Sequence, residues 1–61
     1  MKYRIGSIIE YKSTCGQARR VRVTEKLADV KHGCSGFDAV TLTDGFEVWG
    51  YDDQITRVVV R

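Results

Sequence analysis

The strict alternation of polar and apolar residues over residues 20–24 (RVRVT) constrains the fold of this chain more than any other feature. A period of two is that of a β-strand, in which successive side chains point to opposite faces of the sheet. Val21 and Val23 therefore share one face, which we expect to be buried, whereas two arginines and a threonine share the other. The pattern predicts a strand over residues 18–26.

Four further segments have the β-branched and aromatic composition that is typical of strands. They are residues 7–13 (SIIEYKS), 37–43 (FDAVTLT), 46–51 (FEVWGY) and 55–61 (ITRVVVR). No segment shows a helical period long enough to pack across a sheet. The sequence therefore predicts about five strands and no long helix.

The connections between these strands are marked by glycine and aspartate. Residues 33–36 contain two glycines and are expected to form a loop, and the Asp-Gly pair at residues 44–45 predicts a hairpin. Residues 27–32 (LADVKH) fit either one helical turn or a continuation of the strand before them. Residues 52–54 (DDQ) resemble the opening of a single helical turn, for which an aspartate pair is a natural N-cap.

Both faces of the segment 37–43 carry apolar side chains, so alternation alone does not decide which face is buried. Phe37 and Ala39 share one face, and Val40 and Leu42 share the other. We expect Val40 and Leu42 to be buried.

A chain of 61 residues forms a single domain, residues 1–61. A domain of this size buries only about 60% of the surface that its unfolded chain exposes. Five short strands close most economically into a small barrel, which also hides the sheet edges. We therefore expect an all-β protein, a single small five-stranded barrel with one short helical turn before the last strand.

This order of elements resembles a Src-homology-3-like small barrel. The resemblance is carried by residues 6–11 (GSIIEY), as the first strand, and by residues 49–55 (WGYDDQI), as the fourth strand and the turn. Over most of its length the chain is also similar to short uncharacterised proteins of actinobacterial phages and their hosts, in residues 22–26 (RVTEK), 36–38 (GFD) and 49–55. Neither resemblance implies an activity, and residues that bind proline-rich ligands are not recognisable.

Length and composition argue against catalysis in a deep pocket and against a membrane span. Cavities for drug-sized ligands need roughly 300 Å3 or more, which leaves little core in a chain of 61 residues. Apolar residues make up 43% of the chain and charged residues 30%, which is ordinary for a soluble globular protein. No apolar stretch approaches the roughly 18 residues of a membrane span, and the first residues lack the apolar stretch of a signal peptide. We expect a cytoplasmic protein that is not an enzyme.

The residues that could bind a metal or act as a nucleophile form an incomplete set. Cys15, His32 and Cys34 are the soft ligands, but a structural zinc site usually needs four, often in paired C-x-x-C spacing. A pair of Cys34 and His32 lacks the further groups that a nucleophilic site needs. Without a secretory signal, both cysteines are expected to be free thiols. We predict no metal, no cofactor and no catalytic residue.

The strongest candidate for binding is a set of aromatic and acidic residues near the C-terminal end of the chain. If Val48 points inward, Trp49 and Tyr51 point outward, where such side chains are enriched in binding hot spots; alternatively, Trp49 fills one end of the core. The leading hypothesis is a module that receives a positively charged protein partner through the following residues: Asp44, Glu47, Trp49, Tyr51, Asp52 and Asp53.

Two alternatives follow from the distribution of charge. Residues 1–26 carry seven Lys or Arg against two Glu, and residues 27–61 carry three Lys or Arg against six Asp or Glu. One alternative is nucleic-acid binding by a basic strand face formed by Arg19, Arg20, Arg22 and Lys26. The other is self-association, in which the basic face of one copy meets the acidic face of another. Solvated charges that protect a strand edge would explain the same arginines without a ligand.

Overall fold

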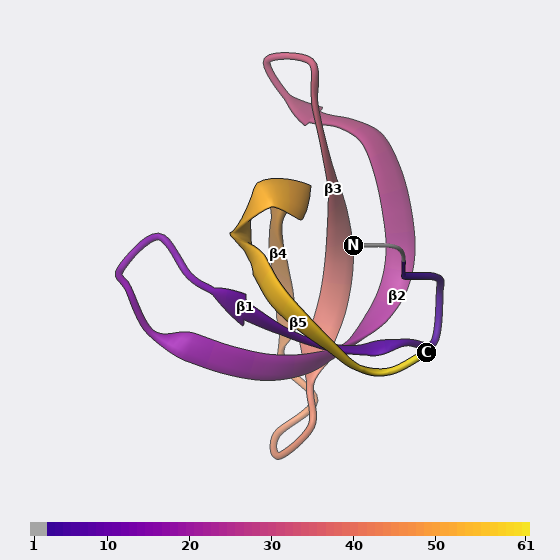
Figure 1. Ribbon diagram of the computed structural model, residues 1–61, viewed down its shortest axis with the longest axis vertical. Coiled ribbons are helices and arrows are strands. Elements are labelled where there is room, and N and C mark those ends of the chain that lie inside the picture. The colour runs from indigo at the N-terminus through magenta and orange to yellow at the C-terminus, as the bar shows by residue number, and fades with distance from the viewer. Residues whose placement is uncertain (1–2) are drawn as a thin grey trace.

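The computed structural model describes residues 3–61, apart from the side chain of Lys31. Five strands and one short turn of 3-10 helix follow one another along this part of the chain (Figure 1). They are β1 (Ile8–Lys12), β2 (Ala18–Lys31), β3 (Cys34–Thr41), β4 (Glu47–Tyr51), η1 (Asp52–Gln54) and β5 (Ile55–Val60). The predicted all-β class is confirmed, as is the helical turn before the last strand. Because η1 is the only helical element in residues 3–61, this region contains no helix able to cross a membrane.

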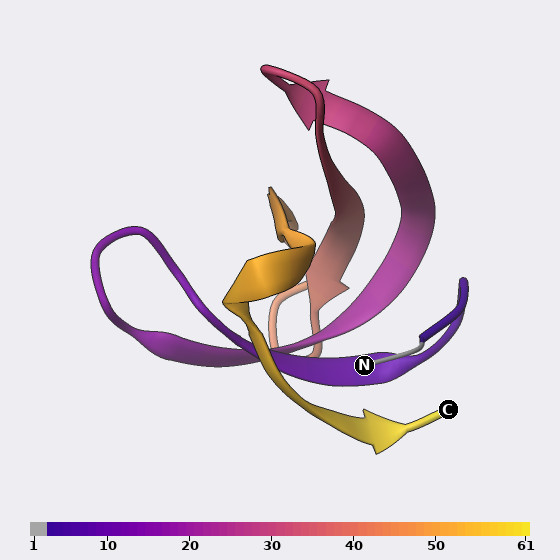
Figure 2. The ribbon, with the colours of Figure 1, turned by 45° about the horizontal axis from the view of Figure 1, so that its top comes forward.

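The strands form one antiparallel sheet in the order β4-β3-β2-β1-β5. The long strand β2 is shared between two parts of this sheet: its beginning pairs with β1, the remainder pairs with β3, and Val21 and Arg22 pair with both. A register shift between Val23 and Glu25 marks a bulge, which increases strand bending. Figures 1 and 2 show β2 curving so that the sheet wraps around η1.

The sheet is not closed. Its outermost strands are β4 and β5, and no ladder joins them in the part of the chain that the structure describes. The predicted closed barrel is therefore not confirmed, and two strand edges remain.

The hydrophobic core lies on the concave face of the sheet. Its buried members are Tyr3, Ile9, Tyr11, Val21, Val23, Phe37, Ala39 and Ile55. Phe37 is at its centre, with the Tyr3 and Tyr11 rings edge-on to it at centroid distances of 6.1 and 5.3 Å. Edge-to-face contacts of this kind are favourable because the positive ring edge meets the negative face. Val21 and Val23 are buried, as the alternation in this strand predicts.

The prediction that Val40 and Leu42 are buried is wrong. Phe37 and Ala39 are buried instead, whereas Val40 is half-buried on the opposite face and Leu42 is 43% exposed in the loop after β3. Burying the other face of β3 would have brought Asp38 into the core, where an unpaired carboxylate is costly. The charge of Asp38 therefore indicates the correct face better than a count of apolar residues.

The connection between β2 and β3 is shorter than predicted. Residues 27–32 continue the strand almost to their end, and the turn consists of His32 and Gly33, with φ angles of 55° and 75°. Two successive positive φ angles make the kind of two-residue turn that matches the twist of a hairpin. The expectation of a loop over residues 33–36 is therefore wrong, because residues 34–36 already belong to β3.

The predicted hairpin at residues 44–45 is confirmed, and its loop contains residues 42–46. Thr41 N–H donates to the carbonyl of Phe46 at 2.9 Å, just beyond the last pair of the ladder, Val40 with Glu47. Gly45 has a φ of 70°, which glycine adopts without steric cost.

The interpretation of the aspartate pair as an N-cap is wrong. The cap of η1 is Tyr51, whose N–H donates to Oε1 of Gln54 at 2.8 Å. Asp52 and Asp53 are the first two residues of the turn itself, where negative charge is also favourable.

Candidate functional site

Trp49 lies on the outer, solvent-facing side of β4. Its neighbour Gly50 faces the core, where an added Cβ would lie 2.9 Å from the ring of Phe37. Alternation therefore directs Trp49 and Tyr51 outward. Trp49 is 44% exposed, and its ring meets that of Tyr51 edge-on, with centroids 5.5 Å apart. Of the two interpretations of Trp49, the outward one is confirmed.

Three exposed carboxylates share this outer face with Trp49. The register pairs Trp49 with Asp38 on β3, and Asp38 with Glu25 on β2. Glu47 precedes Trp49 by two residues and so shares its face of β4. No carboxylate of this trio forms an ion pair with any described residue. We call Glu25, Asp38, Glu47 and Trp49 the acidic half of the outer face.

The outer face on the other side of the bend carries arginines. Arg20 donates to Glu10 at 2.8 Å, and Nε of Arg57 lies 3.8 Å from the other oxygen of the same carboxylate. The hydrogen bond from Arg20 holds the pKa of Glu10 below its ordinary value, and the charge of Arg57 acts in the same direction. Arg22 has no carboxylate partner within residues 3–61. We call Arg20, Arg22 and Arg57 the basic half.

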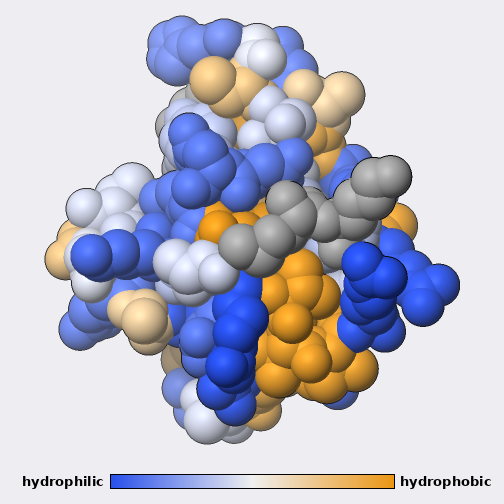
Figure 3. All heavy atoms as spheres, viewed as in Figure 1, coloured by the Kyte–Doolittle hydropathy of each residue, from blue (hydrophilic) through white to orange (hydrophobic). Residues whose placement is uncertain are grey.

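The basic half also contains exposed aliphatic side chains. Val60 on β5 pairs with Ile8 on β1, and Val60 is exposed at the end of its strand. At the lower right of Figure 3, an apolar patch lies over this end of the sheet, with strongly hydrophilic residues on either side. Aliphatic and cationic side chains thus lie together here, whereas the acidic half combines carboxylates with an aromatic ring.

The two halves meet at one row of residues across three strands. Arg22 on β2 pairs with Val40 on β3, and Val40 pairs with Glu47 on β4. A shallow hollow of about 240 Å3 lies beside Val40. It is lined by Thr24, Asp38, Ala39, Val40, Glu47 and Val48. Two carboxylates therefore border this hollow, and a cationic group is what such a border attracts.

The structure divides the acidic residues that the sequence predicted as one surface. Glu47 lies beside Trp49, whereas Asp44 lies in the β3–β4 loop and Asp53 is exposed on η1. The carboxylate of Asp52 is occupied, since it accepts hydrogen bonds from the hydroxyls of Tyr3 and Ser35, the latter at 2.8 Å. The sequence analysis missed Glu25 and Asp38, because only the pairing of β2, β3 and β4 brings them to Trp49.

Tyr3 anchors the N-terminal segment across β2, β3 and η1. Its hydroxyl, besides contacting Asp52, lies 3.1 Å from the carbonyl of Gly36. Burial, together with the hydrogen bond to Asp52, raises the pKa of Tyr3. Nζ of Lys26 lies 4.5 Å from the centre of the Tyr3 ring and donates to the Tyr3 carbonyl at 2.9 Å. The ammonium group of Lys26 is therefore held by contacts within the fold.

The basic residues predicted as a nucleic-acid surface do not form one patch. Arg20 and Arg22 point outward from β2. Arg19 pairs with the buried Tyr11 and so lies on the concave side of the sheet. Lys26 is held against the N-terminal segment. A phosphate backbone that followed the two outward arginines would not reach the other two cations.

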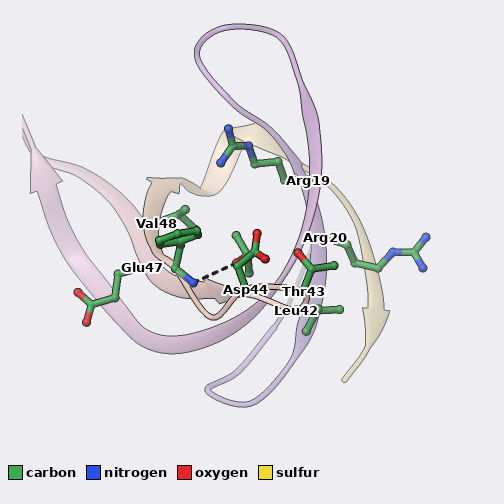
Figure 4. A pocket seen from close by; sticks show the side chains of 9 residues that line it. Arg19, Arg20, Leu42, Thr43, Asp44, Glu47 and Val48 are labelled. Atoms are coloured by element: carbon green, nitrogen blue, oxygen red, sulfur yellow. Dashed lines mark hydrogen bonds between the residues drawn. The ribbon is translucent and has the colours of Figure 1, made fainter.

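A larger hollow, of about 860 Å3, lies between β2 and the β3–β4 loop. It is lined by Arg19, Arg20, Thr41, Leu42, Thr43, Asp44, Phe46, Glu47 and Val48. Figure 4 shows Arg20 and Glu47 pointing away from its centre. Phe46, although 68% exposed, belongs to this hollow and not to the acidic half, which makes it a useful comparison for Trp49.

Cys15 and Cys34 are free and exposed. The hydrogen bond between Cys15 and the hydroxyl of Ser13, at 3.2 Å, lowers the pKa of the Cys15 thiol, and the backbone N–H of Gln17 contributes further. Across residues 3–61, no three side chains of His, Cys, Asp and Glu converge in a way that could hold a metal ion.

Comparison with models of protein families, with curated proteins and with solved structures found no match to this chain. The functional argument therefore depends on the surface itself.

Proposed function

We propose that this chain is a non-catalytic interaction module that binds a positively charged protein partner through the acidic half. The observation that carries the proposal is the exposed Trp49, which lies next to Asp38 and Glu47 on one sheet face. Neither carboxylate has a cation of its own among the described residues. A partner that supplies the cation satisfies both charges and covers the indole at the same time.

The two kinds of side chain contribute differently to such a complex. An exposed tryptophan offers a large, rigid contact area, and its ring face attracts a guanidinium or ammonium group. The surrounding carboxylates select a positive partner, speed the encounter and set its orientation. Together they have the composition expected of a hot spot with a polar rim.

We also infer that the fold is a Src-homology-3-like small barrel whose sheet stays open between β4 and β5. The strand order, the long β2 shared by two parts of the sheet, and η1 immediately before β5 support this inference. In such a fold the core occupies the concave side, so binding residues lie on the outer face or on loops.

The same geometry favours a protein partner over nucleic acid. The four predicted basic residues are divided between the two sides of the sheet, and Arg20 shares its charge with Glu10. The acidic half would repel a phosphate backbone that extended beyond Arg22.

The test uses a fluorescein-labelled peptide, GRIRVG, and its glutamate counterpart, GEIEVG, in anisotropy titrations at low salt. We expect the arginine peptide to bind and the glutamate peptide not to bind.

Trp49→Ala should weaken binding about tenfold or more, since truncation of a hot spot costs at least about 1.4 kcal/mol. Phe46→Ala is the control, because it removes another exposed aromatic ring that lies outside the acidic half. Equal binding by folded Trp49→Ala and by the unmodified chain would show that the proposal is wrong.

A further inference from the structure

We propose that the partner of the acidic half is a second copy of this chain, which places its Arg22 in the hollow between Asp38 and Glu47. The inference rests on the proposed function, because it names the partner of the same surface. Its basis is that one face of one sheet carries both unpaired carboxylates and an unpaired cation, Arg22, in the same row of residues within residues 3–61. The Arg22 of each copy can therefore pair with the carboxylates of the other copy.

The register of the sheet makes this face self-complementary. Arg22, Val40 and Glu47 are neighbours in one row on β2, β3 and β4. Adjacent strands are about 4.8 Å apart, so Arg22 and Glu47 lie at about equal distances on either side of Val40. A two-fold axis that runs along β3 above Val40 therefore places Arg22 of each copy over Glu47 of the other. The arrangement is isologous and closes at two copies.

The hollow beside Val40 has the chemistry that an arginine needs. Its border includes the carboxylates of Asp38 and Glu47, and a guanidinium is a planar group with donors for both. Trp49 pairs with Asp38 across the ladder, so its ring lies next to the incoming cation. The half-buried Val40 meets its own counterpart on the axis and supplies an apolar centre.

The association should be weak and strongly dependent on salt. Its contacts are mainly between exposed charges, which are screened over about 10 Å at 0.1 M salt. The convex outer face also limits the contact area of two copies, which places the complex among small, transient interfaces.

The experiment is sedimentation velocity of the full chain at about 20 mM and 300 mM salt, with a reducing agent present so that Cys15 and Cys34 stay free. We expect a concentration-dependent dimer at low salt that dissociates at high salt. Arg22→Glu and Glu47→Arg should each be monomeric, since each places like charges opposite one another twice. Lys12→Glu, an equal change of charge at an exposed strand position outside the row, should still dimerise.

The decisive arm is an equimolar mixture of Arg22→Glu and Glu47→Arg chains. In a heterodimer of the two, both contacts are again between opposite charges, so the mixture should recover the dimer that neither variant forms alone. A mixture that stays monomeric, although both variants are folded by circular dichroism, overturns the proposal. So does an unmodified chain that stays monomeric at low salt and millimolar concentration.

These outcomes are separable from failure of the proposed function. The peptide titration is made with the chain at nanomolar to micromolar concentration, where a weak dimer is dissociated. Trp49-dependent binding of GRIRVG without dimerisation overturns the second copy as partner and leaves the proposed function standing. Absence of both overturns both.

Discussion

The two halves of the outer face differ in where their charges find partners. In the basic half, the carboxylate of Glu10 contacts both Arg20 and Arg57, whereas Arg22 has no carboxylate partner among the described residues. In the acidic half, Asp38 and Glu47 have no cation among the described residues. The comparison indicates that Arg20 and Arg57 are held by a contact within the fold, whereas Arg22 and the carboxylates of the acidic half have charge left for a partner.

The two sides of the sheet at β3 and β4 also differ. The concave side carries Phe37, which is fully buried and contacts aromatic rings from two other segments. The outer side carries Trp49, which remains 44% exposed. One aromatic residue is therefore part of the core and the other is partly exposed at the surface, although they lie on paired strands, at register positions one residue apart.

The largest expected effect tests the contrast between Phe37 in the core and Trp49 at the surface. Phe37→Ala should lower the free energy of unfolding by about 3–5 kcal/mol, because it leaves a cavity at the centre of the core. A chain of 61 residues has little stability beyond that amount, so we expect the variant to be largely unfolded. Trp49→Ala should change the free energy of unfolding by less than about 1 kcal/mol. Urea denaturation followed by circular dichroism compares the two, and similar losses would contradict the assignment of one ring to the core and the other to the surface.

A smaller effect concerns the N-terminal segment, which Tyr3 joins to β3 and η1. Tyr3→Phe removes the hydroxyl that contacts Asp52 and the Gly36 carbonyl, and should cost about 0.5–1.5 kcal/mol. Tyr11→Phe is the control, because its ring contacts Phe37 in the same way but no hydrogen bond of its hydroxyl is found in the part of the chain described. Equal losses in the same urea assay would mean that the hydroxyl of Tyr3 does not contribute.

The smallest effect concerns the ion pairs of the basic half. Because the folded state lowers the pKa of Glu10, its contribution to stability is present above the ordinary carboxyl pKa. That contribution disappears as the pH falls through the lowered pKa of the folded state. Thermal unfolding of Glu10→Gln and of the unmodified chain should therefore differ slightly at pH 7 and converge at acidic pH, once the carboxyl of Glu10 is protonated in the folded state. A difference that does not change with pH would show that the charge of Glu10 is not its cause.

Much of the fold could be predicted from local pattern, and the exceptions have identifiable causes. Alternation correctly placed Val21 and Val23 in the core, because those residues have no apolar competitor on the other face. In β3 both faces carry apolar residues, and a shift of one residue exchanges them. The packing of Phe37 between two tyrosine rings, together with the charge of Asp38, decided the outcome.

The candidate site was predicted only in part. Trp49 and Glu47 were found, because their relation follows from alternation along one strand. Asp38 and Glu25 were not, since they come from other strands and reach Trp49 only through the pairing of β2, β3 and β4. The hydrogen bonds of Asp52 to Tyr3 and Ser35 likewise join segments that are far apart in the chain.

The sequence by itself determined the all-β class, the single helical turn and the buried face of β2, because each depends on residues close together in the chain. Only the tertiary structure decided that Lys26 turns away from Arg20 and Arg22, because the bulge after Val23 shifts the alternation of β2. It also brought Arg22, Val40 and Glu47 into one row. The physical reason is that strand pairing and the bulge in β2 set the register between distant segments, and register determines which charges become neighbours.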